Sequence, residues 1–308
     1  MKISVVSTVY LSKPFLEEFL LKINIALKET KIDDYEIIFI NDSSPDDSLC
    51  FLLDKRKIDN KIKIVDLSRN FGHHYAMQAG LKYAKGDLIF LIDNDLETDP
   101  KVLVDFYNEM KCNENVDVVY GFQESRKGPF FERLSGKVFW WAINKMSDTK
   151  IPHNILTERL MRRNYVDDLL TLQDANLFLG GMMHWVGYNQ KGIAVPKKTR
   201  KGYSTYTIKK RIELMIQAIS SFSGKPLEWL FYFGLLISLF SFLFIFYLIA
   251  MKMLYGPRIE VGWSSLIAVN LLILGIISTF LGVIGIYLFK IFKQVQGRPN
   301  ALIKKIYE

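Results

Sequence analysis

The sequence predicts an α/β fold: a parallel, doubly wound sheet, followed by two apolar helices. Three observations lead to this prediction. Short apolar runs alternate with helical patterns as far as residue 120. Polar side chains follow several of these runs directly. Two uncharged segments, 230–251 and 261–289, are each long enough to cross a bilayer core of about 30 Å as a helix. The 308 residues allow one large domain or two smaller ones.

The predicted elements follow one another in a regular order. Short runs rich in Ile, Val and Leu predict strands at 2–9, 36–40, 61–67, 88–92 and 116–120. Apolar residues at helical spacing predict helices at 14–30, 48–57, 75–84 and 100–112. Asp99 and Pro100 are typical of the N-cap and first residue of the last helix.

An acidic cluster follows the apolar run 88–92. Asp93, Asp95 and Glu97 alternate with Asn94 and Leu96, so an extended chain would direct the three carboxylates to one side. Hard oxygen ligands of this kind select Mg²⁺ or Mn²⁺, usually together with substrate phosphates. The alternative is an acidic loop that only caps the next helix.

Polar residues follow three of the predicted strands, as Asp42, Arg69 and the pair Asp93 and Asp95. Ligands of open α/β sheets bind at the carboxyl ends of the strands. A carboxylate there accepts from a base N–H or a ribose hydroxyl, and an arginine binds phosphate. Each residue alone also fits a turn, a cap or a surface position, whereas their convergence indicates a nucleotide site. His73 and His74 show no metal-ligand spacing and are expected to be loop residues near a ligand, or to have no role.

The net charge of +8 is concentrated beside the apolar segments. Residues 190–211 hold eight Lys or Arg and no acid, and the tail 290–308 is also basic. By the positive-inside rule both flanks lie in the cytoplasm and the link between the spans lies outside. Basic flanks favour anionic lipids, and nucleic acid is not an expected partner. Cys50 and Cys112 are expected to be free thiols, and no secretion signal is recognised.

Three motifs, in order, resemble glycosyltransferase family 2. Residues 40–46 read I-N-D-S-S-P-D, similar to V-D-D-G-S-x-D. Residues 67–73 read L-S-R-N-F-G-H, similar to L-S-R-N-F-G-K, and 93–100 read D-N-D-L-E-T-D-P, similar to D-A-D-L-Q-D-P. With two C-terminal spans, the whole chain resembles the polyprenyl-phosphate glycosyltransferases, the branch of dolichyl-phosphate-mannose synthase and the bactoprenol glucosyl transferases.

This resemblance implies a GT-A domain over 1–225 and an inverting sugar transfer from a nucleotide-sugar, with Mg²⁺ or Mn²⁺ as cofactor. UDP-glucose is the first expectation for the donor and undecaprenyl phosphate for the acceptor, in O-antigen or surface-polysaccharide modification. The implied nucleotide-sugar contacts are Thr8, Val9, Tyr10, Asp42, Arg69, Asp93, Asn94 and Asp95. The implied metal ligands are Asp93, Asp95 and Glu97, and the implied catalytic residues are Asp93, Asp95, Arg126 and Arg200.

The chain also departs from the family pattern. Residues 8–12 read T-V-Y-L-S where the family has P-V-Y-N-E, and Gln123 replaces an arginine. Asn154 and Thr157 stand where some members carry an aspartate proposed as the catalytic base. Because a phosphate acceptor is already an anion, positioning and leaving-group stabilisation supply much of the catalysis without that base.

The remaining predictions concern the membrane side. The aromatic stripe at 129–147 predicts an interfacial helix, with a core helix as the alternative. Arg126 belongs to a loop that would close over the donor, or to a plain surface loop. The run 199–206, T-R-K-G-Y-S-T-Y, resembles R-x-x-G-x-S-x-Y and makes Arg200 and Ser204 candidates for the acceptor phosphate; a positive-inside signal is the other reading.

The expected organisation is a cytoplasmic domain over 1–225, spans at 226–251 and 261–289, and a basic cytoplasmic tail at 290–308, in a multi-pass inner-membrane protein. Ser278 and Gly282 allow close helix packing, either between the two spans or in a homo-oligomer such as a tetramer. Two other functions stay open: a membrane transferase acting directly on a glycan, and a non-catalytic nucleotide-binding partner.

Overall fold

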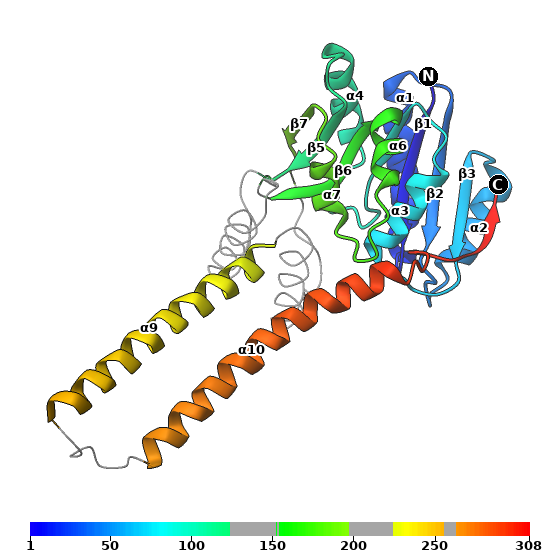
Figure 1. Cartoon of the computed structure of the whole chain (residues 1–308). Coiled ribbons are helices and arrows are strands. Elements are labelled where there is room, and N and C mark those ends of the chain that lie inside the picture. The colour runs from blue at the N-terminus through cyan, green and yellow to red at the C-terminus, as the bar shows by residue number, and fades with distance from the viewer. Residues whose placement is uncertain (124–151, 153, 197–223, 256–262) are drawn as a thin grey trace.

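The computed structural model describes residues 1–123, 152, 154–196, 224–255 and 263–308. Within them an eight-stranded sheet has the order β7-β5-β6-β4-β1-β2-β3-β8 (Figure 1). The strands are β1 (Ile3–Val9), β2 (Tyr35–Asn41), β3 (Ile62–Leu67), β4 (Leu88–Leu91), β5 (Val118–Phe122), β6 (Ile155–Arg162), β7 (Gln190–Ala194) and β8 (Ile303–Tyr307).

Helices cover both faces of this sheet, because its inner strands are apolar on both sides. On one face lie α1 (Lys13–Thr30), α2 (Ser48–Ile58) and α4 (Val102–Cys112). On the other lie α3 (His73–Tyr83), α6 (Arg163–Thr171) and α7 (Leu179–Trp185). Helix α3 approaches the sheet closely at Gly80, where a Cβ would come within 2.4 Å of Ile40 Cδ1.

The sheet is mixed, so the prediction of a parallel sheet is wrong for two strands. Strand β6 is antiparallel to β4 and β5, and β8 is antiparallel to β3. The segment that forms β6, I-L-T-E-R-L-M-R, contains three polar residues in succession, so it lacks the continuous apolar run of the other strands. Helix α4 begins at Val102, two residues after its predicted start, because residues 99–101 form a turn in which Asp99 O accepts the Val102 N–H.

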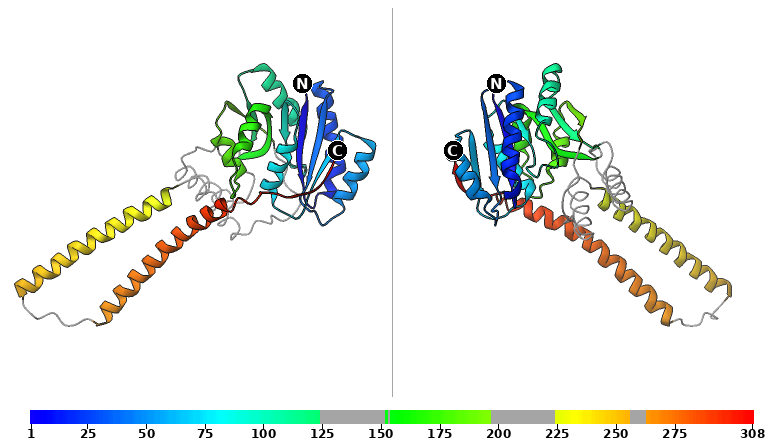
Figure 2. Two further views of the ribbon diagram at one scale, coloured as in Figure 1. Left: turned by 45° about the vertical axis from the view of Figure 1, so that its right-hand side comes forward. Right: turned by 180° about the vertical axis from the view of Figure 1, so that it is seen from behind.

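Two long helices, α9 (Lys225–Tyr255) and α10 (Trp263–Val295), project from one side of the α/β domain (Figures 1 and 2). In the part of the chain that the structure describes, one segment, Ile273–Val295, is long and apolar enough to span a membrane, with a mean hydropathy of 2.0. The membrane placement of both helices stays a prediction. After α10 the chain returns to the sheet as β8, which the sequence does not predict within its basic tail.

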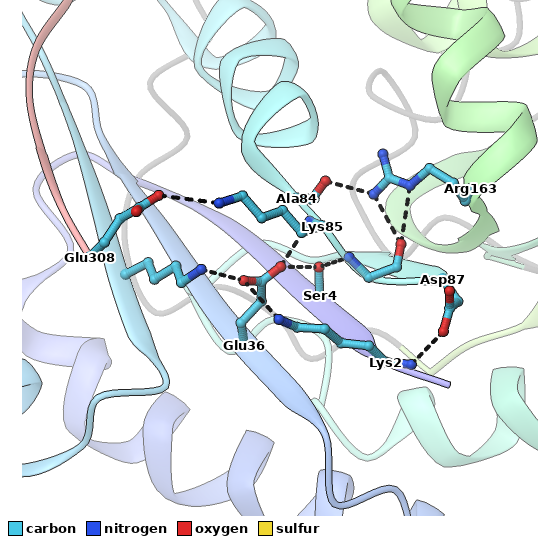
Figure 3. Close-up of polar contacts among 10 residues, drawn as sticks. Lys2, Ser4, Glu36, Ala84, Lys85, Asp87, Arg163 and Glu308 are labelled. Atoms are coloured by element: carbon cyan, nitrogen blue, oxygen red, sulfur yellow. Dashed lines mark hydrogen bonds and ion pairs between the residues drawn. The ribbon is translucent and has the colours of Figure 1, made fainter.

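The amino end of the sheet carries a closed polar network around Glu36 (Figure 3). The Glu36 side chain is 2% exposed and accepts from Ser4 Oγ at 2.6 Å, Lys63 Nζ at 2.7 Å and Lys85 N at 2.8 Å. Lys2 Nζ lies 3.5 Å away. Burial alone would raise the pKa of Glu36, but the donors from Lys63, Ser4 and Lys85 outweigh it and lower this pKa to about 2.

Candidate functional site

The carboxyl ends of β1, β2, β3 and β4 meet at the opposite edge of the sheet. Backbone hydrogen bonds continue the pairing past the strand ends: Asp42 N–H donates to Val9 O, and Ile92 N–H donates to Val6 O. The loops that carry Asp42 and Arg69 leave the neighbouring strands β2 and β3, and the loop that carries Asp93 leaves β4, on the other side of β1. All three lie at the same end of the sheet, as the sequence predicts. This edge is where ligands bind on open α/β sheets.

Asp42 organises the loop between β3 and α3. It is 3% exposed. Its Oδ1 accepts the Phe71 N–H at 2.8 Å, and its Oδ2 accepts the Gly72 N–H at 2.9 Å. Gly72 has a φ of +102°, a conformation that side-chain-bearing residues rarely adopt. Each carboxylate oxygen keeps further acceptor capacity, so the predicted base contact of Asp42 stays open alongside this loop-holding role.

Arg69 lies exposed at the end of β3. Its guanidinium carbon stands 4.2 Å from the centroid of the Phe71 ring, and its Nη1 donates to Asn70 O at 3.4 Å. Among the described residues no carboxylate forms an ion pair with Arg69. Stacking on an aromatic ring orients the guanidinium while leaving its donors free to bind an anion.

The loop after β4 turns rather than extending. Asn94 is buried, and its Nδ2 donates to Thr8 O at 2.8 Å, while Asp95 Oδ1 accepts the Glu97 N–H at 3.0 Å. Leu96 has a φ of 58°. The prediction that an extended chain aligns Asp93, Asp95 and Glu97 is therefore wrong, and across the described residues no three His, Cys, Asp or Glu side chains form a group that could hold a metal ion.

Asp93 and Asp95 nevertheless fit a hard divalent cation by the chemistry of their donors. Both are partly exposed at the ligand edge, and the Asp93 side chain is 28% exposed. Carboxylate oxygens in a site that stays open to water and phosphate are the ligands Mg²⁺ and Mn²⁺ take. The backbone N–H of Glu97 donates to Asp95 Oδ1, and the predicted role of the Glu97 carboxylate as a metal ligand stays a prediction.

His73 contacts two of the predicted site residues, whereas the sequence alone predicts only a loop residue near a ligand, or a residue with no role. Its Nδ1 lies 2.9 Å from Thr8 Oγ1, and its Nε2 lies 3.4 Å from Asp93 Oδ1. These contacts fit the tautomer with a proton on Nε2, which faces Asp93. Loss of surrounding water lowers the pKa of His73, against the opposing effect of Asp95 and Asp42. The available signal was a histidine at the position of the family's lysine in 67–73.

The other predicted donor contacts lie at the end of β1. Thr8 is half-buried beside His73, and Tyr10 is 48% exposed. The Val9 side chain is fully buried in the core and its carbonyl accepts the Asp42 N–H. Val9 therefore supports the edge through packing and backbone pairing.

Gln123, Asn154 and Thr157, which depart from the family pattern, lie at or beside the start of β6, next to the carboxyl end of β4. Asn154 has a φ of 58° and lies at the turn before β6, where its carbonyl accepts the Gln123 N–H. Arg159 is buried and donates to the carbonyls of Thr157 and Leu156. The predicted interfacial helix 129–147, together with Arg126, Arg200 and Ser204, lies outside the described residues.

Comparisons with known proteins agree with these motifs. The sequence profile of "Glycosyl transferase family 2" matches residues 4–170. The chain is 36% identical to the uncharacterized glycosyltransferase YkcC of Bacillus subtilis, over 99% of this chain and 94% of the relative. It is 30% identical to the bactoprenol glucosyl transferase of Shigella phage SfII, over 99% and 98%.

A solved structure, the mannosyltransferase PcManGT of Pyrobaculum calidifontis in complex with GDP-Man and Mn²⁺, is similar at 13% identity and a TM-score of 0.48, over 96% of this chain and 86% of that one. This TM-score is too low to carry an argument about the site. The family profile covers more than half of the chain, and relatives above 30% identity cover nearly all of it. The chain therefore belongs to glycosyltransferase family 2 and is a hexosyltransferase with a GT-A-like α/β fold.

Proposed function

We propose that this enzyme transfers a sugar from a nucleotide-sugar to undecaprenyl phosphate at the cytoplasmic face of the membrane. The observation behind the proposal is that one continuous sheet bears the predicted nucleotide site and is also linked to an apolar helix. The carboxyl ends of its strands lead to Asp42, Arg69, Asp93 and Asp95, and its outermost strand β8 is joined to the apolar helix α10 by the short segment 296–302. A nucleotide site joined this closely to a membrane helix suits a water-soluble donor and a lipid acceptor.

The acceptor class follows from the relatives and from the chemistry of the site. Relatives at 30% identity are named bactoprenol glucosyl transferases. A lipid phosphate is an anionic nucleophile, so transfer to it needs no strong general base. This agrees with Thr157, which stands where some family members carry an aspartate.

The reaction is a single displacement. A phosphate oxygen of the lipid forms the new bond to the anomeric carbon while the bond from that carbon to the nucleoside diphosphate breaks, and the configuration inverts. Arg69 binds a phosphate of the donor, and Asp42 and His73 hold the loops that present Arg69 and Asp93. Asp93 and Asp95 would hold a divalent cation, which, when bound, neutralises charge on the departing diphosphate.

The donor proposed first is UDP-glucose, and the pathway is modification of O-antigen or another surface polysaccharide. The protein would be multi-pass, with both termini in the cytoplasm. The two alternatives fit less well: processive glycan synthases carry a Q-x-x-R-W motif, which this sequence lacks, and a binding module has no need of the acidic pair beside Arg69.

The test is a lipid-labelling assay with the full-length chain. Membranes that contain the protein and undecaprenyl phosphate are incubated with Mn²⁺ and each of several labelled nucleotide-sugars, and the lipid is extracted. We expect one donor, UDP-glucose first, to label the lipid fraction. Label that enters only glycan would favour the direct glycan transferase. Binding of UDP with no transfer or hydrolysis of any donor would favour the binding module.

A further inference from the structure

Side-chain amides fasten the end of α10 to the α/β domain. Gln294, next to last in α10, lies at the end of the apolar segment Ile273–Val295. Its Nε2 donates to Gln173 O at 2.9 Å, and its Oε1 accepts the Ala175 N–H at 2.8 Å. One side chain thus pairs with a backbone acceptor and a backbone donor of the loop between α6 and α7.

The same loop is held from the side of the nucleotide site. The Tyr75 hydroxyl, on α3, donates to Ala175 O at 2.9 Å and accepts the Leu177 N–H at 3.5 Å. Tyr75 comes two residues after His73, which contacts Thr8 and Asp93. Ala175 therefore connects the end of α10 with the first turn of α3.

A second pair of amides repeats this arrangement. Asn300 Nδ2 donates to Gln78 Oε1 at 2.8 Å and to Asp174 O at 3.2 Å, and Gln78 Nε2 donates to Leu172 O at 3.3 Å. We call Tyr75, Gln78, Gln294 and Asn300 the clasp. All four side chains are uncharged near neutral pH, so salt does not screen their contacts.

The chain beyond the clasp reaches the site loop itself. Leu302 O accepts the Ser68 N–H at 2.9 Å, and Ile303 pairs with Leu67 in the sheet. Ser68 precedes Arg69. The loop that presents Arg69 is therefore held at its start by the C-terminal segment and at its end by the Asp42 carboxylate.

We propose that the clasp fixes the position of the nucleotide-sugar site relative to α10, and so relative to the membrane surface. It thereby controls the delivery of a membrane-held acceptor and takes no part in donor binding. This inference rests on the proposed function. A lipid phosphate reaches the donor only from the membrane surface, so a loosened domain lowers its effective concentration at the anomeric carbon. The donor arrives from solution and does not depend on that position.

Substitutions at Gln294 test this with the full-length chain in vesicles that contain undecaprenyl phosphate. Gln294→Met keeps the length of the side chain and removes both hydrogen bonds, whereas Gln294→Glu still accepts from Ala175 but cannot donate to Gln173. We expect the rate of lipid labelling to fall about tenfold in Gln294→Met and by less in Gln294→Glu, as expected for two hydrogen bonds. The Kd of UDP with Mn²⁺ should stay within about twofold of wild type.

Gln296→Met is the matched control, because Gln296 and Gln294 are both exposed, but the Gln296 side chain makes no hydrogen bond to the described residues. Equal labelling rates for Gln294→Met and Gln296→Met would overturn the proposal. An equal loss of UDP binding and labelling would also overturn it, because general destabilisation would then explain both.

A distance measurement separates the clasp from the proposed function. In a Cys50→Ser background, spin labels are attached at Cys112 on α4 and at Ser278→Cys on α10. We expect a narrow distance distribution in the otherwise wild-type chain and a broad one with Gln294→Met. If no donor labels lipid, the proposed function fails, yet this distribution still tests the clasp: an unchanged distribution would overturn it.

Discussion

The two ends of the central sheet use charge in opposite ways. At the amino end Glu36 is enclosed, and Lys2, Lys63, Ser4 and the Lys85 N–H surround its carboxylate (Figure 3). At the carboxyl end the charged groups of Arg69, Asp93 and Asp95 are exposed or half-buried.

This difference shows what an arrangement of charges is suited to do. The Glu36 carboxylate is buried and enclosed by Ser4, Lys2, Lys63 and the Lys85 N–H, so it is not accessible to a ligand and contributes stability. At the other end the donors and acceptors that the fold uses are mostly backbone groups: Asp42 binds two N–H groups, and Asn94 binds a carbonyl. The remaining side chains there are oriented and still open to a ligand.

The largest expected effect is on the carboxyl end. We predict that Asp95→Asn lowers the rate of sugar transfer by about 100-fold or more, because a preorganised charge opposite the departing diphosphate is lost. The melting temperature should change by no more than a few degrees, since Asp95 is half-buried and its hydrogen bond is a local one, with the Glu97 N–H. Steady-state transfer assays measure the rate, and thermal unfolding measures the melting temperature.

Asp99→Asn is the matched control for Asp95→Asn. It removes the same charge from the same loop, where Asp99 accepts the Lys101 N–H and lies 3.6 Å from Lys22. Its transfer rate should stay within about threefold of wild type, because an exposed ion pair contributes little. Equal losses in the two variants would show that the loop responds to net charge and that Asp95 has no specific role.

At the amino end we predict a loss of stability with little change in sugar transfer. Glu36→Gln should lower the free energy of unfolding by about 3 kcal/mol, from a pKa lowered from 4.5 to about 2, while transfer below the melting temperature stays near wild type. Glu17→Gln, at a surface pair with Lys55, should cost no more than about 0.5 kcal/mol. A transfer rate of Glu36→Gln that falls together with its stability would contradict a purely structural role for the amino end of the sheet.

The pH dependence of stability sharpens this prediction. The folded-state pKa of Glu36 is depressed, so its contribution is complete above the unfolded value of 4.5 and is lost as the pH falls toward about 2. Urea unfolding of the wild type should therefore weaken across this window more steeply than that of Glu36→Gln. Parallel curves for the two proteins would show that Glu36 is not the titrating group.

A smaller effect is expected at Arg69. Removing a charged hydrogen-bond donor to phosphate costs about 1.5–3 kcal/mol, so Arg69→Ala should weaken nucleotide-sugar binding by roughly 10- to 100-fold. Arg69→Lys keeps the charge but loses the planar group that stacks on Phe71. Its affinity for the nucleotide should therefore lie between those of wild type and Arg69→Ala. Calorimetric Kd values for UDP would decide. Unchanged binding in Arg69→Ala would place the diphosphate elsewhere.

The smallest effect is expected at Phe71. Phe71→Leu removes the ring on which Arg69 stacks, worth about 0.5–1 kcal/mol at an exposed site, so binding should weaken about two- to fivefold. In the Arg69→Ala background the same change should have no effect on the UDP Kd. Additive losses in the double variant would contradict a role that acts through Arg69.

The sequence predicted the parts of the fold that depend on local periodicity. The five strands and four helices as far as residue 122 occur within a few residues of their predicted bounds. Strand β8 escaped prediction because I-K-K-I-Y lies in a basic tail and pairs with β3, which lies more than 200 positions earlier. Such pairing depends on tertiary structure, which a local pattern does not contain.

The candidate site likewise contains features that follow from the sequence pattern and features that depend on tertiary structure. Asp42, Arg69 and Asp93 were predicted at one end of the sheet because the carboxyl ends of parallel strands meet there, and the structure places the ends of β2, β3 and β4 on that side, with β1 between β4 and β2. The contact of His73 with Thr8 and Asp93 was not predictable, because it depends on how the loop before α3 turns at Gly72. The turn at Leu96 likewise overrides the alternation of the acidic residues.

The most direct test of this account is the initial rate of label transfer from UDP-glucose to undecaprenyl phosphate. It is measured for wild type, Asp95→Asn and Glu36→Gln at a temperature where all three are folded. We predict labelled lipid with wild type and Glu36→Gln and about 100-fold less, or none, with Asp95→Asn. Equal labelling by Asp95→Asn and wild type, or loss of labelling in folded Glu36→Gln, would contradict it.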